Sequence, residues 1–146
     1  MIFERYNPPL FFVTACVRDR RPFLANDAVS GILADGWRNS LDSSGWIVGR
    51  YVIMPDHVHF FAAPAREDAK DLSYFMRDWK RWTCRRIRDS GVVSFAWQGE
   101  FFDHLLRSNE SYAEKWEYVR MNPVRAELVD NPDAWPYQGE IHLLQR

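Results

Sequence analysis

The spacing of apolar residues along this chain changes repeatedly between that of a strand and that of a helix. Residues 9–18 are β-branched and aromatic, which is typical of a buried strand. From residue 27 onward apolar residues recur at helical spacing, and Ser43-Ser44-Gly45 is expected to end that helix. Residues 46–53 and 57–63 are again strand-like, and the three-residue turn between them favours a hairpin. The first half therefore predicts strand, helix, strand, strand.

The second half predicts a long helix, a strand and a last helix. Residues 70–89 carry an apolar stripe at helical spacing, residues 101–106 are strand-like, and a helix runs from 110 to about 122. The complete order matches the split β-α-β pattern of ferredoxin-like domains. We therefore expect an α+β fold with a four-stranded antiparallel sheet, helices on one face and an added C-terminal helix.

The ends of the last helix can also be predicted. Ser108 or Asn109 can cap its start. Pro123 disfavours helical geometry at Asn122, so the helix is expected to end or kink there. A short helical turn is expected at 124–128, and the tail after it is rich in Pro and Trp and is expected to be irregular.

Length and composition favour one globular domain over residues 1–146, with 47% hydrophobic and 27% charged residues. Cys16 and Cys84 are far apart, which excludes a disulfide framework and a Cys-rich zinc site and predicts two buried thiols. No apolar run approaches the roughly 18 residues of a membrane span. The start, Met1 to Arg5, lacks the layout of a signal peptide. These features predict a cytoplasmic protein without membrane contact.

Two histidines stand at alternate positions of the third predicted strand. Side chains at i and i+2 of a strand point to one face, so His57 and His59 are expected side by side, with Val58 pointing the other way. Their neighbours are apolar, and a buried imidazole needs hydrogen-bond partners or a metal. The pattern leaves two interpretations open, a satisfied core pair or a pair of metal ligands or catalytic groups.

Tyr118 and Asn122 form a second pair on the last predicted helix. Residues at i and i+4 lie on one helix face, so a phenol and an amide oxygen would point to the same place. A tyrosine is a weak nucleophile unless a base or a metal activates it. The alternative is a core tyrosine followed by an Asn-Pro that ends the helix.

A basic stripe lies along the predicted helix 70–89. Six basic residues fall within twelve positions, against one acidic residue, Asp78. A charged helix face is usually only a solvated face, but in a chain of net charge −1 this local concentration also suits a phosphate backbone. Exposed Trp rings can stack on bases. The predicted DNA contacts on this helix are Arg77, Lys80, Arg81, Trp82, Arg85 and Arg88.

These motifs resemble a known family when they are taken together. Met-Pro-Asp-His-Val-His-Phe at 54–60 resembles the His-hydrophobic-His motif of HUH-superfamily single-strand endonucleases. Residues 118–129, Tyr-Val-Arg-Met-Asn-Pro-Val-Arg-Ala-Glu-Leu-Val, are similar to the nucleophile helix of the small single-tyrosine transposases, and the REP-associated tyrosine transposases are the most similar branch. Further similarities are Phe12-Val13-Thr14, Trp97-Gln98 and Phe102-Asp103-His104 leading to Arg107.

The resemblance implies a single HUH endonuclease domain with a defined site. It implies that His57, His59 and Asn122 bind a divalent metal and that Tyr118 attacks the scissile phosphate, which leaves a 5′-phosphotyrosine. Two imidazoles favour a first-row transition ion, whereas Mg²⁺ prefers oxygen ligands. We expect Mn²⁺ in the test tube and Mg²⁺ as the abundant ion in the cell.

The implied substrate is single-stranded DNA near a hairpin, with Arg125 as a further DNA contact. Relatives include dimers as well as monomers, so a homodimer is one of two expected states. The alternative to an enzyme is a domesticated protein that binds hairpin or single-stranded DNA without cutting it. This chain departs from the family at two positions, with Asp56 where Asn is usual and Glu127 where Gly is usual.

Overall fold

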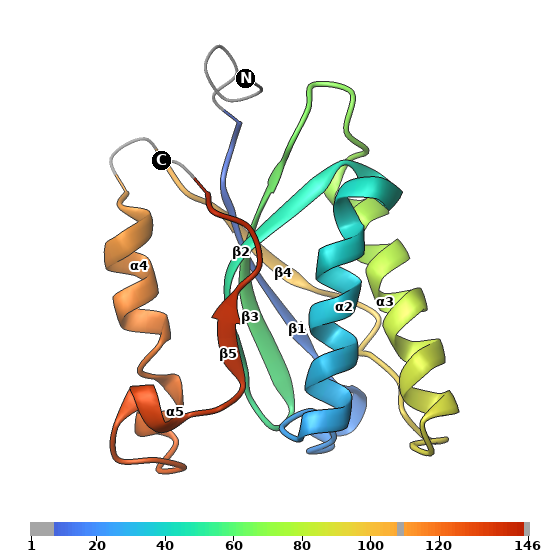
Figure 1. Ribbon diagram of the computed structural model, residues 1–146, viewed down its shortest axis with the longest axis vertical. Helices are drawn as coiled ribbons and strands as arrows, with labels where there is room; N and C mark the ends of the chain where they lie inside the picture. The colour runs from blue at the N-terminus through green and yellow to red at the C-terminus, as the bar shows by residue number, and fades with distance from the viewer. Residues whose placement is uncertain (1–7, 108–109, 145–146) are drawn as a thin grey trace.

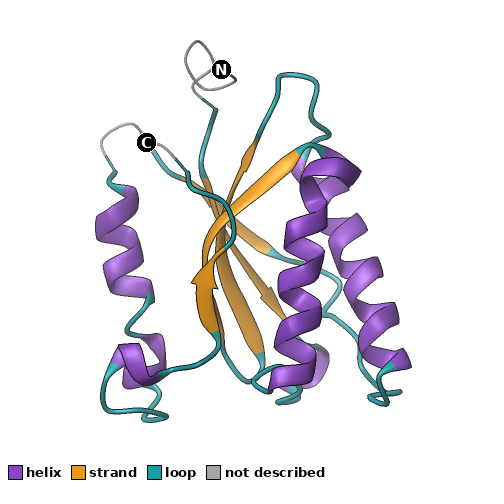
Figure 2. Cartoon of the chain, in the orientation of Figure 1, coloured by secondary structure: helices purple, strands orange, loops and turns teal. Residues whose placement is uncertain are grey.

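The computed structural model describes residues 8–107 and 110–144. The start of the chain, where a signal peptide is not expected, and the predicted caps Ser108 and Asn109 lie outside these ranges. The main elements are β1 (Phe11–Cys16), α2 (Asp27–Ser44), β2 (Trp46–Ile53), β3 (His57–Pro64), α3 (Leu72–Asp89), β4 (Phe102–Leu105), α4 (Tyr112–Val119), α5 (Asn122–Arg125) and β5 (Gln138–Glu140). Two short 3-10 turns, η1 (Arg18–Arg20) and η2 (Pro132–Ala134), complete the chain (Figures 1 and 2).

The strands form one antiparallel sheet in the order β4-β1-β3-β2-β5. The predicted α+β architecture and the split β-α-β order are confirmed, but the sheet has five strands instead of four. The fifth strand, β5, pairs with β2 and comes from the tail that we expected to be irregular. Its sequence, Gln-Gly-Glu, has no apolar alternation, so only its pairing with β2 makes it a strand.

The predicted end of α2 at Gly45 is confirmed, and side-chain caps mark the start of both long helices. Asn26 caps α2 by accepting a hydrogen bond from the amide of Val29. Gly45 ends that helix with φ 81°, a left-handed conformation that glycine adopts without strain. Asp71 caps α3 by accepting from the amide of Tyr74. These caps fix where the two long helices start and stop relative to the sheet.

Helices cover both faces of the sheet, so the expectation of helices on one face describes only α2 and α3. These two helices lie side by side on one face, and α4 lies on the other (Figure 1). Strand alternation in β3 divides the core accordingly. Val58 and Phe60 pack in the cluster that includes Trp37 and Trp79 of α2 and α3. Phe61 packs in the second cluster, which contains residues of α4 and the tail.

The last helix is shorter than predicted and broken. α4 ends at Val119 and α5 begins at Asn122, so Tyr118 and Asn122 do not share one continuous helix. The helix breaks because Pro123 has no N–H to donate and restricts the residue before it. Ser111 is the N-cap of α4 and accepts a hydrogen bond from the amide of Glu114. The predicted turn at 124–128 corresponds to α5, which starts two residues earlier and ends three residues earlier than expected.

Candidate functional site

Strand β3 places His57 and His59 side by side, as its alternation predicts. Their ring centroids are 4.8 Å apart and the rings are nearly perpendicular. Both side chains share the face of Phe61, which packs against Tyr112 and Trp116 of α4. Val58 points to the opposite face and is fully buried there. The histidine pair therefore lies between the sheet and the layer that contains α4.

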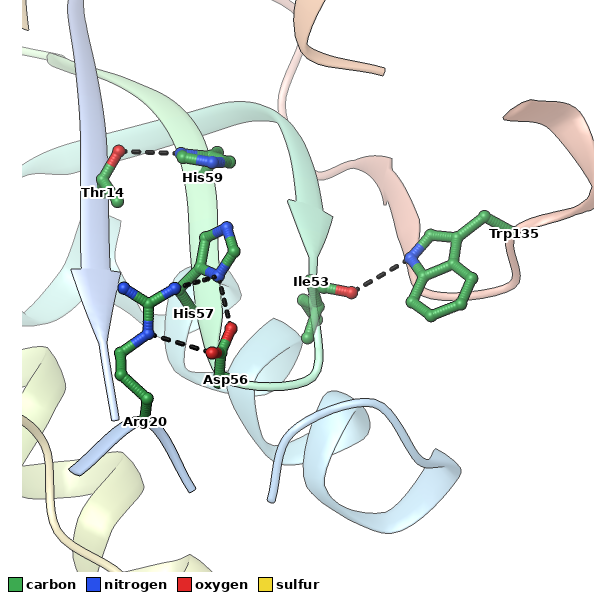
Figure 3. Close-up of polar contacts among 7 residues, drawn as sticks. All are labelled: Thr14, Arg20, Ile53, Asp56, His57, His59 and Trp135. Atoms are coloured by element: carbon green, nitrogen blue, oxygen red, sulfur yellow. Dashed lines mark hydrogen bonds and ion pairs between the residues drawn. The ribbon is translucent and has the colours of Figure 1, made fainter. Parts of the chain in front are cut away.

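His59 is largely buried. Its Nδ1 lies 2.7 Å from the Thr14 hydroxyl on β1 (Figure 3). Its ring stacks on that of Phe12, with 5.3 Å between the ring centroids. Lys115 of α4 covers the ring of Phe12, with 4.9 Å between its Nζ and the ring centroid. Burial, together with the nearby charges of His57, Lys115 and Arg125, lowers the pKa of His59 to about 3. His59 is therefore a neutral imidazole at neutral pH, which is the form that binds metals.

His57 lies in a polar cluster at the turn before β3. Its Nδ1 is 2.6 Å from one carboxylate oxygen of Asp56 and 3.3 Å from a guanidinium nitrogen of Arg20. Arg20 Nε donates to the other oxygen of Asp56 at 2.9 Å (Figure 3). Burial raises the pKa of Asp56, but the hydrogen bonds from Arg20 and His57 outweigh it and leave the pKa below its ordinary value.

These contacts fit two of the three predicted metal ligands. Each histidine uses Nδ1 for a polar partner, and within the described ranges neither Nε2 has a hydrogen-bond partner. Histidine ligands typically bind through one nitrogen while the other contacts a carboxylate or another polar group. The described residues contain no cluster of three His, Cys, Asp or Glu side chains for a metal, so a third protein ligand would have to be of another type. The predicted one is the amide of Asn122.

Arg125 contacts both the predicted nucleophile, Tyr118, and the predicted third ligand, Asn122. Its guanidinium lies 4.2 Å from the centroid of the Tyr118 ring and donates to the Tyr118 carbonyl at 2.8 Å. The same nitrogen donates to Oδ1 of Asn122. Tyr118 is 65% exposed, so the core-tyrosine interpretation is wrong. Arg125 also contributes to the lowered pKa of His59, which places its charge near the histidine pair.

The predicted DNA-contacting stripe lies on the other side of the molecule. The buried residues of α3 pack in the cluster on the far face of the sheet, so the exposed face of α3 points away from His57 and His59. Lys80 donates to the carbonyls of Gln98 and Glu100, and burial lowers its pKa. Arg88 donates to the carbonyl of Phe95.

The rest of the stripe is more open. In the described ranges Arg81 and Arg85 have no ion-pair or hydrogen-bond partner; together with Trp82 they line a surface hollow, and Arg86 lies 4.0 Å above the Trp82 ring. The guanidinium of Arg77 lies 5.6 Å from the ring centroid of Tyr74. Trp79, which accompanies Trp82 in the sequence, is instead buried in the core. Cys16 is buried as predicted, whereas Cys84 is only half-buried.

Comparison with known proteins gives one family. The family described as "Transposase IS200 like" matches residues 11–120. The chain belongs to the IS200-like transposase family. This segment contains both histidines and Tyr118 and ends before Asn122.

Individual relatives agree with this assignment. A Haemophilus influenzae protein assigned as a REP-associated tyrosine transposase is 26% identical to this transposase over 143 residues, which cover 89% of this chain and 78% of the relative. The REP-associated tyrosine transposase of Escherichia coli is 25% identical over 91 residues, 62% of this chain and 52% of the relative. A solved REP-associated tyrosine transposase bound to a REP hairpin shares the fold, with a TM-score of 0.74, 23% identity and coverage of 92% of this chain and 79% of that chain. The predicted resemblance to REP-associated tyrosine transposases is therefore confirmed.

Membership in a transposase family implies that this protein is a DNA-cleaving enzyme. Within the described part of the chain, no helix is long and apolar enough to cross a membrane. Sequence reasoning missed Thr14, Arg20 and Lys115 as neighbours of the histidines. Of these three residues, only Thr14 could have been singled out from the sequence, because it is a polar residue within an otherwise apolar strand.

Proposed function

We propose that this transposase is a metal-dependent single-strand DNA endonuclease and strand transferase with Tyr118 as its nucleophile. The observation that supports this most is the pair of adjacent imidazoles, each with Nδ1 engaged and Nε2 without a partner in the described ranges. An exposed tyrosine on the helix that covers the same face supplies the second part of the proposal. The proposal does not depend on Tyr118 and Asn122 lying on one continuous helix.

In the proposed reaction Oη of Tyr118 attacks the scissile phosphorus. The new bond joins the tyrosine oxygen to phosphorus, and the bond from phosphorus to the 3′ oxygen breaks. Oη loses its proton as it attacks, and the 3′ oxygen takes up one proton and leaves as a free hydroxyl, so the step is neutral in protons and the protein keeps a 5′-phosphotyrosine. Because the link is again a phosphodiester, a different 3′-hydroxyl can reverse the attack and join two strands.

The chain's own residues would prepare this step. His57, His59 and Asn122 would hold a Mn²⁺ or Mg²⁺ ion, which when bound supplies positive charge for a phosphate oxygen in the transition state. Arg125, which contacts both Tyr118 and Asn122, would exchange its amide contact for a DNA phosphate. The substrate class we propose is single-stranded DNA beside a hairpin, with Arg81, Arg85 and Trp82 as contacts at a distance from the histidines.

The decisive experiment mixes the protein, Mn²⁺ and labelled single-stranded DNA and measures a denaturation-resistant adduct. Wild type is expected to form it and Tyr118→Phe is expected to form none. Tyr112→Phe is the matched control, because Tyr112 lies on the same helix but its hydroxyl accepts from the amide of Arg50. Equal adduct from Tyr118→Phe would refute the assignment of the nucleophile.

The same assay tests the role of a homodimer. Mixing His57→Ala with Tyr118→Phe restores adduct formation only if one copy lends its tyrosine to the histidines of another. Failure of the mixture, beside an active wild type, means that each chain uses its own Tyr118.

A second candidate function is binding to hairpin or single-stranded DNA without cleavage. The contact between Arg125 and Asn122 favours it, because the predicted third ligand atom is already engaged. Hairpin binding with no adduct under any divalent metal would support this alternative against the enzyme.

A further inference from the structure

Asp56 is shared between a histidine and an arginine. Its Oδ1 lies 2.6 Å from Nδ1 of His57, and its Oδ2 accepts from Nε of Arg20 at 2.9 Å. The Asp56 and His57 side chains are both largely buried, whereas Arg20 is more than half exposed. The carboxylate therefore has one oxygen on the guanidinium and one on the imidazole.

This arrangement determines which nitrogen of His57 carries the proton. A carboxylate only accepts hydrogen bonds, so a contact of 2.6 Å requires Nδ1 of His57 to donate. A guanidinium only donates, so the 3.3 Å approach of Arg20 to the same nitrogen is not a hydrogen bond in that tautomer. With the proton on Nδ1, the lone pair of a neutral His57 lies on Nε2.

The backbone around the turn holds this cluster in place. The amide of Val17 donates to the carbonyl of Asp56 at 2.9 Å, and the amide of Leu24 donates to the carbonyl of Pro55 at 3.0 Å. Between these two anchors the chain passes through Asp19 and Arg20, which have φ values of 58° and 54°. The left-handed conformation is unfavourable for residues other than glycine, because their Cβ crowds the backbone. The backbone is therefore strained at Asp19 and Arg20, the segment that places the Arg20 side chain against Asp56.

We infer that Asp56, braced by Arg20, is a positioning residue that fixes His57 in the tautomer with its lone pair on Nε2. The functional role of this tautomer rests on the proposed function, in which Nε2 of His57 binds the metal. His59 has no equivalent device, because the Thr14 hydroxyl can donate or accept and so leaves the tautomer open. The two histidines are thus held differently, one by a fixed acceptor and one by an adaptable hydroxyl.

The tautomer can be measured without a metal by ¹⁵N NMR of the imidazoles, with His57 assigned from a His57→Gln spectrum. In wild type, Nδ1 of His57 is expected to carry the proton. Asp56→Ala is expected to populate the other tautomer, and Arg20→Ala is expected to do so to a smaller extent. Asp68→Ala is the matched control, because it removes the carboxylate from an arginine pair of 3.0 Å that contacts no histidine.

Asp56→Asn keeps the size of the side chain and serves if Asp56→Ala does not fold. Its amide offers an N–H as well as an oxygen, so a smaller shift in the same direction is expected. An unchanged His57 tautomer in the folded Asp56 variants would overturn the inference. Wild-type protonation on Nε2 would overturn it as well.

Metal affinity gives a second measurement that separates this inference from the proposed function. Calorimetric titration with Mn²⁺ is expected to show affinity about 10–100-fold weaker in Asp56→Ala, the usual effect of losing the partner of a histidine ligand, and unchanged in Asp68→Ala. Wild-type affinity in Asp56→Ala would overturn the positioning role. If wild type itself binds no Mn²⁺, the proposed metal site is refuted, and the tautomer measurement still decides what Asp56 does.

Discussion

The two faces of the central strand β3 are used in opposite ways. Toward α2 and α3 it presents Val58 and Phe60, which are fully buried among aromatic rings. Toward α4 it presents His57 and His59, each bound to polar neighbours. The first face presents apolar side chains and stabilises the fold. The second leaves imidazole nitrogens available between layers.

The site therefore depends on a rigid strand but contributes little to the rigidity of that strand. Trp37 and Trp79 stack with planes 4° apart, and Phe60 lies against both. Gly36 permits this packing, because a Cβ there would lie 2.9 Å from Nε1 of Trp79. Variants on the two faces of the same strand should therefore separate stability from chemistry.

The largest expected effect is on the aromatic face. Phe60→Ala removes a fully buried ring and should lower the free energy of unfolding by about 3–5 kcal/mol. His57→Ala, three residues earlier on the other face, should cost about 1 kcal/mol while abolishing the metal-dependent adduct. Urea unfolding measures the first quantity and the cleavage assay the second. Equal destabilisation by both variants would mean that the two faces of β3 contribute equally to stability.

The next effect concerns a tyrosine that shares α4 with Tyr118. Burial is the largest cause that raises the pKa of Tyr112, to about 12 from an ordinary 10.0. The unfolded chain ionises first, so this contribution to stability is complete below pH 10 and is lost as the pH rises through 12. Two pKa units correspond to about 2–3 kcal/mol.

The difference in unfolding free energy between wild type and Tyr112→Phe, measured from pH 9 to 11.5, checks this. Wild type should lose stability relative to the variant as the pH rises. A constant difference across that range would show that burial does not hold the Tyr112 phenol in its neutral form.

A smaller effect is expected at Glu127, which has φ 61° directly after the C-cap of α5. Glycine adopts this conformation freely, and the resemblance predicts glycine here. Glu127→Gly should raise the free energy of unfolding by about 1 kcal/mol. Ala126→Gly is the control, because Ala126 has φ −84° and glycine there should lower stability. A stability loss in Glu127→Gly would mean that the side chain has a role that outweighs the strain.

How much of this was predictable depends on whether the signal is local. The alternation in β3, the end of α2 at Gly45 and the order of strands and helices along the chain are local properties, and they are confirmed. The fifth strand and the face covered by α4 depend on contacts between distant segments, so no local pattern contains them. The break between Tyr118 and Asn122 follows from Pro123, but its position three residues earlier than expected does not. Arg20 reaches Asp56 only because a loop folds back on the turn, which spacing alone cannot predict.

The smallest expected effect is on the basic stripe of α3. This stripe is the exposed face of a helix that packs on the aromatic side of the sheet, and the prediction tests whether it binds DNA. If about five phosphates are neutralised on a single strand, the log–log slope of affinity against salt should be near −3.5, and each lost contact should reduce its magnitude by about 0.7. Arg81→Gln with Arg85→Gln should therefore flatten the slope to about −2, because neither side chain has another described partner.

Arg66→Gln should leave the slope unchanged, because Arg66 is paired with Asp68. The adduct formed at saturating DNA should also be unchanged in the double variant, since α3 points away from the histidines. A nearly flat salt response in wild type would mean that the stripe is only a solvated face. Loss of adduct at saturating DNA would mean that the two faces of the sheet are not functionally separate.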